Sequence, residues 1–441
     1  MRISKFIIVI VLAVGLLSAS LRAAEPAYVF VGVNVVPMDR ERVMTNQNVV
    51  VQDGKITSIF AGSPDRAPAG AVRINGSGKY LMPGLAEMHG HIPPPNQPAQ
   101  WIEDVLFLYV ANGITTVRGM LGSEGQLALR EKAKAGTIVS PNLYLAGPSF
   151  NANGPKSEAE AIQMVRAQKA AGWDLLKVHP GPTIPIYDAM ARTAKEVGIR
   201  FGAHVPADVG LLHAIRAGQE TFDHIDGYLE YLNGASGPID NTKLNEVVRL
   251  TKQSGAWIVP TMALWETIQG TLELQTVTGY PELKYMPANQ VKQWTDQHRT
   301  RLSNPNFNPA TAKRVIQNRM IVLKALHQGG VPILLGTDAP QQFSVPGFSI
   351  HREMKRMLDA GMSPYEVIKS GTQNVGTYFK SQDTFGTVAV GGRADLILVD
   401  ANPLENLANI ARRSGVMVKG RWMTESEIQS RLAKIAGSAG N

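Results

Sequence analysis

Short apolar runs alternate with stretches of helical periodicity through most of the chain. Eight of these runs have the length and β-type composition of strands. In chain order they are LMPGLAEMH, GITTVRGM, PNLYLAG, WDLLKVH, GIRFGAHV, QETFDHIDG, AWIVPTM and VPILLGTD. Ser157 and Glu160 form a capping-box pattern at the start of one intervening helical stretch. This alternation predicts an α/β fold with a parallel sheet.

The number of strands decides between two α/β architectures. Eight β/α units within residues 81–375 predict a closed (β/α)8 TIM-type barrel. An open, doubly wound sheet is the alternative, with less support because no strand is followed by a glycine-rich nucleotide-binding fingerprint. Residues 263–318 interrupt the rhythm after the seventh strand. We expect this insertion to be either a lid over a site or a structural helical excursion.

A different pattern occupies the two ends of the mature chain. Residues 27–80 and 376–425 contain short β-type runs, and Asp53-Gly54 lies between two of them as a hairpin signal. We therefore expect one small β-sandwich domain assembled from both ends of the chain. Residues 426–441 are expected to form a C-terminal tail.

The first 24 residues have the layout of a secretory signal peptide. Arg2 and Lys5 precede an apolar run over residues 6–17, and small residues follow. The run is shorter than the roughly 20 residues that span a bilayer, so no stable membrane span is expected after cleavage. An uncleaved membrane anchor is the competing interpretation. The pattern predicts an exported protein, periplasmic or secreted.

The amino-acid composition excludes some classes of ligand and binding partner. The chain has no cysteine, which excludes disulfides and thiolate metal ligands. The formal net charge is +8, but the basic residues form no cluster interleaved with aromatics, so nucleic acid is not an expected partner. We expect a small-molecule substrate, and a homo-oligomer is compatible with the sequence.

Potential metal ligands gather at the predicted strand ends. Five of the nine histidines lie there, together with one lysine and one aspartate. They are His89, His91, Lys177, His179, His204, His224 and Asp338. The carboxyl ends of barrel strands meet at one face, and residues two apart on a strand point the same way. His89 and His91 can therefore hold one ion between neutral imidazoles.

The ordered motifs PGLAEMHGH, DLLKVH, FGAHVP, AGQETFDHIDG, LLGTDAP and GTVAVGGRADLILVDANPL resemble the amidohydrolase superfamily, in particular its imidazolonepropionase-like and prolidase-like members. The resemblance implies two divalent metal ions, with zinc expected. His89, His91 and Asp338 would bind the first ion, and His204 and His224 the second. Lys177, carboxylated on its side-chain nitrogen (N6), would bridge both. Asp338 would also be the catalytic residue that moves the proton during hydrolysis.

Four further residues are candidates for contact with the substrate, and a purely structural role is the alternative for each. His179 shares the strand face of Lys177, and Tyr228 follows His224 closely enough to stabilise an oxyanion. Arg118 ends the second strand and is expected to pair with a substrate carboxylate. His351 follows the eighth strand and, with Glu353, lines or supports the site. The other histidines, His213, His298 and His327, are expected to be ordinary surface residues.

These residues predict a hydrolase of amide or peptide C–N bonds in small substrates such as dipeptides or N-acyl amino acids. A cyclic-amide, lactone or deaminase-type hydrolase is the alternative. Deaminases with a comparable first strand place a His-x-x-Glu pair on strand five, where this chain has HVPAD. A catalytically inactive metal-binding homologue is the second alternative, although all six ligand positions carry competent residue types.

Overall fold

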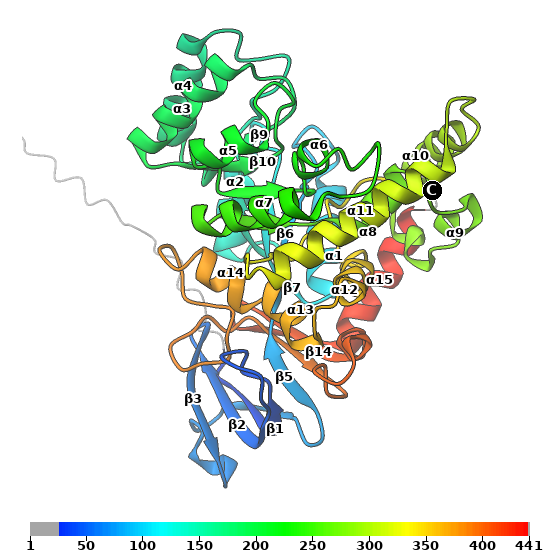
Figure 1. Ribbon diagram of the computed structural model, residues 1–441. Helices are drawn as coiled ribbons and strands as arrows, with labels where there is room; N and C mark the ends of the chain where they lie inside the picture. The colour runs from blue at the N-terminus through cyan, green and yellow to red at the C-terminus, as the bar shows by residue number, and fades with distance from the viewer. Residues whose placement is uncertain (1–25, 440–441) are drawn as a thin grey trace, which may run out of the picture.

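The structure is a computed structural model that describes residues 26–439, and the predicted signal peptide lies outside them. Figure 1 shows two regions, with strands from both ends of the chain on one side and alternating strands and helices on the other. In the described part of the chain, no helix has both the length and the apolar character needed to cross a bilayer.

Seven of the eight expected strands form parallel pairs. They are β6 (Leu85–Gly90), β7 (Ile114–Gly119), β8 (Asn142–Leu145), β9 (Leu175–Val178), β10 (Arg200–Ala203), β11 (Thr221–Asp223) and β12 (Trp257–Val259). Most of these residues are buried, because a parallel sheet is covered on both faces. The α/β prediction from sequence is therefore confirmed.

The eighth expected strand, VPILLGTD, is not a regular strand in the structure. Its residues make single contacts to the strands on either side, and Ile333 forms an isolated parallel bridge with Ile258. The Leu334 N–H donates to Ile258 O at 2.8 Å, and the Met88 N–H donates to Leu335 O at 2.8 Å. The bonds alternate between two neighbours, so neither pairing extends into a ladder. The segment still joins β12 to β6.

The remaining junction lies between β8 and β9. Bridges from Ala146 to Leu175 and from Phe150 to Val178 connect these strands. The backbone hydrogen bonds thus form one closed ring through β6 to β12 and residues 333–338. A (β/α)8 barrel requires this arrangement, and it brings the carboxyl ends of the strands to one face.

Helices follow the strands around this ring (Figure 1). They are α1 (Ala99–Ala111), α2 (Gln126–Ala135), α3 (Glu158–Ala171), α4 (Ile184–Val197), α5 (Leu211–Ala217), α6 (Tyr228–Tyr231), α7 (Asn241–Ser254), α11 (Pro309–Gln328), α12 (Ile350–Asp359), α13 (Pro364–Ser370) and α14 (Gln373–Tyr378). The Ser157 hydroxyl caps α3 by accepting from the Glu160 N–H at 3.2 Å. The Glu160 carboxylate accepts from the Lys156 N–H, so the expected reciprocal bond of a capping box is replaced.

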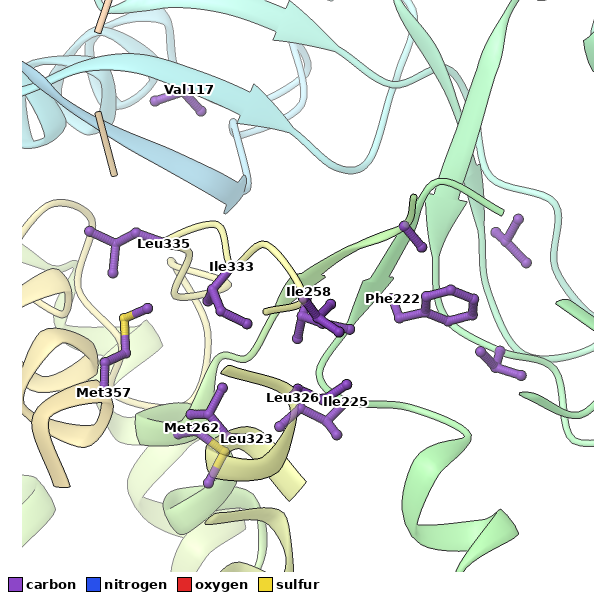
Figure 2. Close-up of a cluster of buried hydrophobic side chains, with 14 of the residues drawn as sticks. Val117, Phe222, Ile225, Ile258, Met262, Leu323, Leu326, Ile333, Leu335 and Met357 are labelled. Atoms are coloured by element: carbon purple, nitrogen blue, oxygen red, sulfur yellow. The ribbon is translucent and has the colours of Figure 1, made fainter. Parts of the chain in front are cut away.

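Apolar side chains fill the space between the ring and its helices. Figure 2 shows part of this core, in which Leu323 and Leu326 of α11 lie among the buried side chains that include Ile258 and Ile333. Burying a side chain of this size contributes about 1.5–3 kcal/mol. This packing fixes α11 against the seventh and eighth positions of the ring.

The expected insertion consists of α8 (Met262–Ile268), α9 (Leu274–Thr278), η2 (Pro281–Tyr285) and α10 (Ala288–Leu302). It is a packed unit, because Trp294 is buried with its ring 5.8 Å from the ring of Phe343, which lies in the loop after the eighth segment. The Gln342 amide also contacts Gln297 of α10 at 3.4 Å. The insertion therefore contacts the loop that carries Asp338.

Both ends of the chain contribute to one eight-stranded sheet. Its strands are β1 (Tyr28–Val35), β2 (Met44–Gln52), β3 (Lys55–Ala61), β4 (Val72–Asn75), β5 (Tyr80–Pro83), β13 (Leu396–Val399), β14 (Arg413–Val418) and β15 (Arg421–Thr424), and the short helices η1 (Pro64–Arg66) and η3 (Leu407–Ala411) lie between them. Antiparallel pairing of β5 with β13 joins the two ends. The sheet supports the expected small β domain, and its division into two layers stays a prediction.

Two local expectations at the ends have clear outcomes. Asp53 and Gly54 have φ values of 51° and 73° and link β2 to β3, as the hairpin signal predicts. Residues of the expected tail form the helix α15 (Glu425–Ala439). Its apolar residues Ile428, Leu432 and Ile435 are buried in a cluster that includes Val110 of α1.

Candidate metal centre

Three potential ligands lie together where β6 ends. The His89, His91 and Asp338 side chains each offer one ligand atom, and these atoms lie within 4.8 Å of one another. His91 Nε2 is 2.6 Å from Asp338 Oδ1, and His89 Nε2 is 3.6 Å from the same oxygen. The two histidines point to one side because they are two residues apart on the strand. This group has the donor types that a divalent transition metal binds.

Three more predicted ligands adjoin this group. The His224 ring lies 4.5 Å from the ring of His89 and 4.6 Å from that of His204. Lys177 Nζ is 2.9 Å from His89 Nε2. His224 Nε2 is buried and has no hydrogen-bond partner in the described structure. A buried nitrogen without a partner is costly, and a metal ion is one acceptor of its lone pair.

The backbone turns at two of these ligands. His224 and Asp338 have φ values of 63° and 64°, in the left-handed region that side chains other than glycine rarely adopt. Such conformations gather at functional sites, where the surrounding structure compensates for their cost. Here they aim a side chain toward the cluster at the point where each chain segment leaves the ring.

Carboxylate and hydroxyl oxygens lie within hydrogen-bond distance of the Nδ1 atoms of three imidazoles. The Nδ1 atoms of His89 and His204 lie 2.6 Å from carboxylate oxygens of Asp223 and Asp226, respectively. His224 Nδ1 lies 2.7 Å from the hydroxyl oxygen of Thr261. In each ring these contacts occupy Nδ1, so that Nε2 is available to bind a metal ion. This is the usual arrangement around metal-binding histidines.

Burial sets the charge of the ligands. It lowers the pKa of His89 and of His224 well below the ordinary histidine value, so both rings are neutral and can donate a lone pair. Burial also lowers the pKa of Lys177 to about 8. Burial alone would raise the pKa of Asp338, but His89 and His91 outweigh it and hold that pKa below its usual range, which keeps the carboxylate ionised.

Comparison with known proteins places this geometry in a family. The family model described as "Amidohydrolase family" matches residues 80–423. The chain belongs to the amidohydrolase family. It is a hydrolase that acts on C–N bonds, with a His/His/Asp metal site. The prolidase-like resemblance in the sequence is thereby confirmed at the level of the family.

Individual relatives of this amidohydrolase are distant in sequence and similar in fold. An ochratoxinase from Aspergillus niger is 23% identical over 460 aligned residues, covering 89% of this chain and 85% of that protein. A bottromycin amidohydrolase superposes with a TM-score of 0.75 at 22% identity, covering 94% of this chain and 91% of the other. A Xaa-Pro dipeptidase with bound methionine superposes with a TM-score of 0.68 at 20% identity, covering 90% of this chain and 100% of the other. These likenesses establish the fold.

The position of Arg118 does not support the expected substrate contact. Its side chain is fully buried beneath the centre, where Nη2 donates to Asp223 Oδ2 at 2.7 Å. Nε donates to Met88 O at 2.5 Å, and Nη1 lies within hydrogen-bond distance of Thr221 and Tyr378. The guanidinium therefore supports Asp223, which in turn supports His89. The sequence signal for this role is weak, because it depends on contacts between distant strands.

The other three expected substrate-binding residues differ in position. His179 is half-buried and its ring stacks on His204 at 4.9 Å, next to the centre. The Tyr228 hydroxyl instead contacts the Thr251 hydroxyl at 2.7 Å and is fully buried in the core. His351 lies on α12 where Arg413 and Arg352 act on its charge, and burial lowers its pKa to about 4. Only His179 has contacts that favour a role in substrate binding.

The remaining histidines are more buried than the sequence suggests. The His298 side chain is buried in the insertion, and its Nε2 contacts Leu272 O at 2.8 Å, so the surface assignment is wrong for this residue. His213 and His327 are half-buried and pair with Asp188 and Glu366. Glu353 is fully buried and accepts from the backbone N–H groups of Met262 and Ala263, which supports the start of α8 beside Thr261.

Proposed function

We propose that this amidohydrolase is a binuclear enzyme that hydrolyses amide bonds of dipeptides or N-acyl amino acids. The observation that carries the proposal is the convergence of a second set of donors on the His/His/Asp group. Lys177, His204 and His224 add a buried amine and two imidazoles to that group. Imidazoles whose Nδ1 atoms accept or donate a hydrogen bond on the side away from the centre are suited to a second ion.

Lys177 fits the centre better as a carbamate than as an ammonium group. A buried cation between metal ligands would repel a bound metal, and burial already lowers the pKa of this amine to about 8. The neutral amine would add to carbon dioxide, form an N–C bond and release one proton. The resulting carbamate would carry one negative charge shared by two oxygens, and these oxygens would be available as ligands to the ions.

The residues around the centre account for hydrolysis. Bound divalent ions, with zinc expected, would polarise the substrate carbonyl and lower the pKa of water. Asp338 accepts a proton from the attacking water and returns it to the leaving nitrogen. Its Oδ1 is oriented by His91 and its Oδ2 by the Gln341 amide at 2.9 Å. His179, stacked on His204, is placed to contact the substrate at the edge of the site.

Two features favour the substrate class. One of the solved structures to which this chain is similar in fold is a Xaa-Pro dipeptidase, an enzyme that acts on dipeptides. Export, which we propose from the basic, apolar and small residues at the start of the sequence, would suit the scavenging of small peptides. A cyclic amide or lactone remains the second candidate, because the same attack acts on either carbonyl.

Metal analysis and a substrate panel test this proposal. The full chain would be expressed with zinc and bicarbonate, and its metal content measured. We expect two ions per chain and hydrolysis of dipeptides or N-acyl amino acids in preference to lactones and cyclic imides. A single ion would overturn the binuclear centre. A metal-loaded protein that hydrolyses none of the panel would support an inactive homologue instead.

A further inference from the structure

A tight turn that follows Asp338 brings a side-chain amide to that carboxylate. The N–H groups of Gln341 and Ser344 each donate to the carbonyl oxygen of the other residue, at 3.3 Å and 2.8 Å. The Gln341 side-chain amide donates to Asp338 Oδ2 at 2.9 Å. Asp338 Oδ1 lies 2.6 Å from His91 Nε2. Each carboxylate oxygen therefore has its own partner, and the two contacts together define the orientation of the carboxylate.

The backbone of this turn is strained. Its two central residues, Gln342 and Phe343, have φ values of 48° and 66°. A positive φ at both central positions is the pattern of a type I′ turn, which asparagine and glycine adopt most readily. Glutamine and phenylalanine are disfavoured there because their Cβ atoms crowd the backbone. Contacts outside the turn therefore have to stabilise this conformation.

The insertion over residues 263–318 provides contacts of this kind. The Phe343 side chain is 1% exposed, and its ring lies 5.8 Å from the ring of Trp294 and 6.0 Å from that of His298, both on α10. Val345 is fully buried in the same apolar cluster as Phe343 and Trp294. Moving Phe343 out of the turn conformation would break this packing, so α10 stabilises the strained backbone.

An arginine of α12 connects the same turn to a second part of the insertion. Arg352 Nη2 donates to Phe343 O at 3.0 Å, and its Nη1 pairs with the Glu282 carboxylate of η2. The guanidinium also lies 4.0 Å from the centre of the Tyr280 ring. Glu282 is buried, and a charged hydrogen bond that is shielded from water is stronger than an exposed one. The backbone and the side chain of Phe343 are thus both fixed by contacts that involve the insertion.

We propose that the insertion positions Asp338 for proton transfer, with Gln341 as the positioning residue and Phe343 as the residue that fixes the turn. The inference rests on the proposed function, in which Asp338 carries a proton from water to the leaving nitrogen. Proton transfer requires the donor and acceptor atoms to be within hydrogen-bond reach, and a displacement of about 1 Å can cost about 100-fold in rate. A fixed turn keeps the Gln341 amide on Oδ2 and limits rotation of the carboxylate.

A double-mutant cycle tests the inference. The metal-loaded full chain would be compared with Gln341→Met, Phe343→Ala and the double variant on the dipeptide or N-acyl amino acid that the wild type hydrolyses fastest. We expect kcat to fall about 10- to 100-fold in each single variant, with KM and metal content within about twofold of the wild type. The double variant should lose no more than the larger single loss, because both changes remove the same contact to Asp338.

Two further variants separate this role from general stability. Phe30→Ala is the matched control, because Phe30 is a fully buried phenylalanine in the sheet formed by the two ends of the chain. It should lower the thermal midpoint and leave kcat unchanged. Phe343→Leu keeps an apolar side chain at the turn, so it should retain more of kcat than Phe343→Ala, and it replaces that variant in the cycle if Phe343→Ala does not fold.

Several outcomes would overturn the inference. An unchanged kcat in Gln341→Met would show that the amide does not orient Asp338. Losses that multiply in the double variant would show that Phe343 does not act through Gln341. Metal loss in Gln341→Met would assign the amide to metal binding instead of proton transfer. A wild type that hydrolyses none of the substrates would overturn the proposed function itself, and the contact between turn and insertion would then be tested by hydrogen exchange.

Hydrogen–deuterium exchange reports that contact without any need for activity. Peptides that cover residues 338–345 would be followed by mass spectrometry in the metal-loaded and the metal-free protein. We expect Phe343→Ala to speed exchange of the Gln341 and Ser344 N–H groups about tenfold or more, because the turn opens more often. Gln341→Met should leave this exchange unchanged, since the backbone pair remains. Equal exchange in the wild type and Phe343→Ala would show that the insertion does not stabilise the turn.

Discussion

Asp223 is the residue on which one buried cation and one metal ligand depend. Its carboxylate contacts both His89 Nδ1 and Arg118 Nη2, and all three side chains are fully buried. An aspartate in this position keeps the imidazole of His89 in the tautomer that exposes Nε2 to the metal. The arginine balances the negative charge that this requires.

Replacement of Asp223 by asparagine should weaken metal binding without removing a ligand. We expect the metal affinity of Asp223→Asn to fall by about 10- to 100-fold, measured by competition with a chromogenic chelator. Asp188→Asn is the matched control, because Asp188 holds His213 at the same 2.6 Å distance away from the centre. Unchanged affinity in Asp223→Asn would show that the contact does not orient His89.

The fully buried Lys177 and the half-buried Lys419 allow the role of Lys177 to be separated from burial itself. Burial lowers the pKa of Lys177 and of Lys419 to about 8. Lys419 donates to the backbone carbonyls of Ala133, Ser140 and Pro141, remote from the histidines. We expect Lys177→Ala to abolish turnover and lower metal content. Lys419→Ala should lower stability and keep full metal content, so equal metal loss in both variants would refute a bridging role.

The helix α8 is the first helix of the insertion after β12, and one carboxylate binds the backbone at its start. Glu353 of α12 accepts the N–H groups of Met262 and Ala263, the first residues of α8. Thr261, immediately before them, has a φ of 47° and contacts His224 through its hydroxyl. A residue of α12 thus positions the turn that holds His224, a proposed metal ligand on another element.

Glu353 should also make stability depend on pH. Burial raises its pKa from 4.5 to about 7, so its contribution to stability is complete below pH 4.5 and is lost as the pH rises through 7. The loss corresponds to about 3 kcal/mol. We expect the unfolding free energy of the wild type, relative to Glu353→Gln, to fall by roughly that amount between pH 4.5 and pH 8 in urea titrations. A pH-independent difference would exclude titration of this carboxyl.

Elements were easier to predict from sequence than the contacts between them. Seven strands could be read from their apolar runs because most of their residues are buried, and their ends located five of the six proposed ligands. The support behind His89 could not be read, because Asp223 is 134 residues away in the chain. The apolar residues of α15 are buried in a cluster that includes residues of α1, and no local pattern in the sequence reveals this contact. The sequence alone therefore predicts only a tail for this segment.

At the scale of the whole molecule, the metal centre is a cross-link between distant parts of the chain. The His/His/Asp site joins β6 to the segment after Ile333 that closes the ring, and the proposed second set of ligands lies at the ends of β9, β10 and β11. The segment after Ile333 has no regular ladder of its own. Ions bound by Asp338 together with His89 and His91 would therefore stabilise a junction of the ring that has no regular ladder.

Removal of the metal should consequently destabilise the whole ring rather than the site alone. Ligands that bind only the native state stabilise it by about 4 kcal/mol at a thousand times the dissociation constant. We expect chelation to lower the thermal midpoint by roughly 5 °C or more, measured by scanning calorimetry. Re-addition of zinc should restore the midpoint in the wild type and restore less of it in Lys177→Ala, which lacks the proposed bridge. A midpoint unchanged after verified metal loss would show that the ring closes through backbone and core packing alone, and that the ions serve only the chemistry.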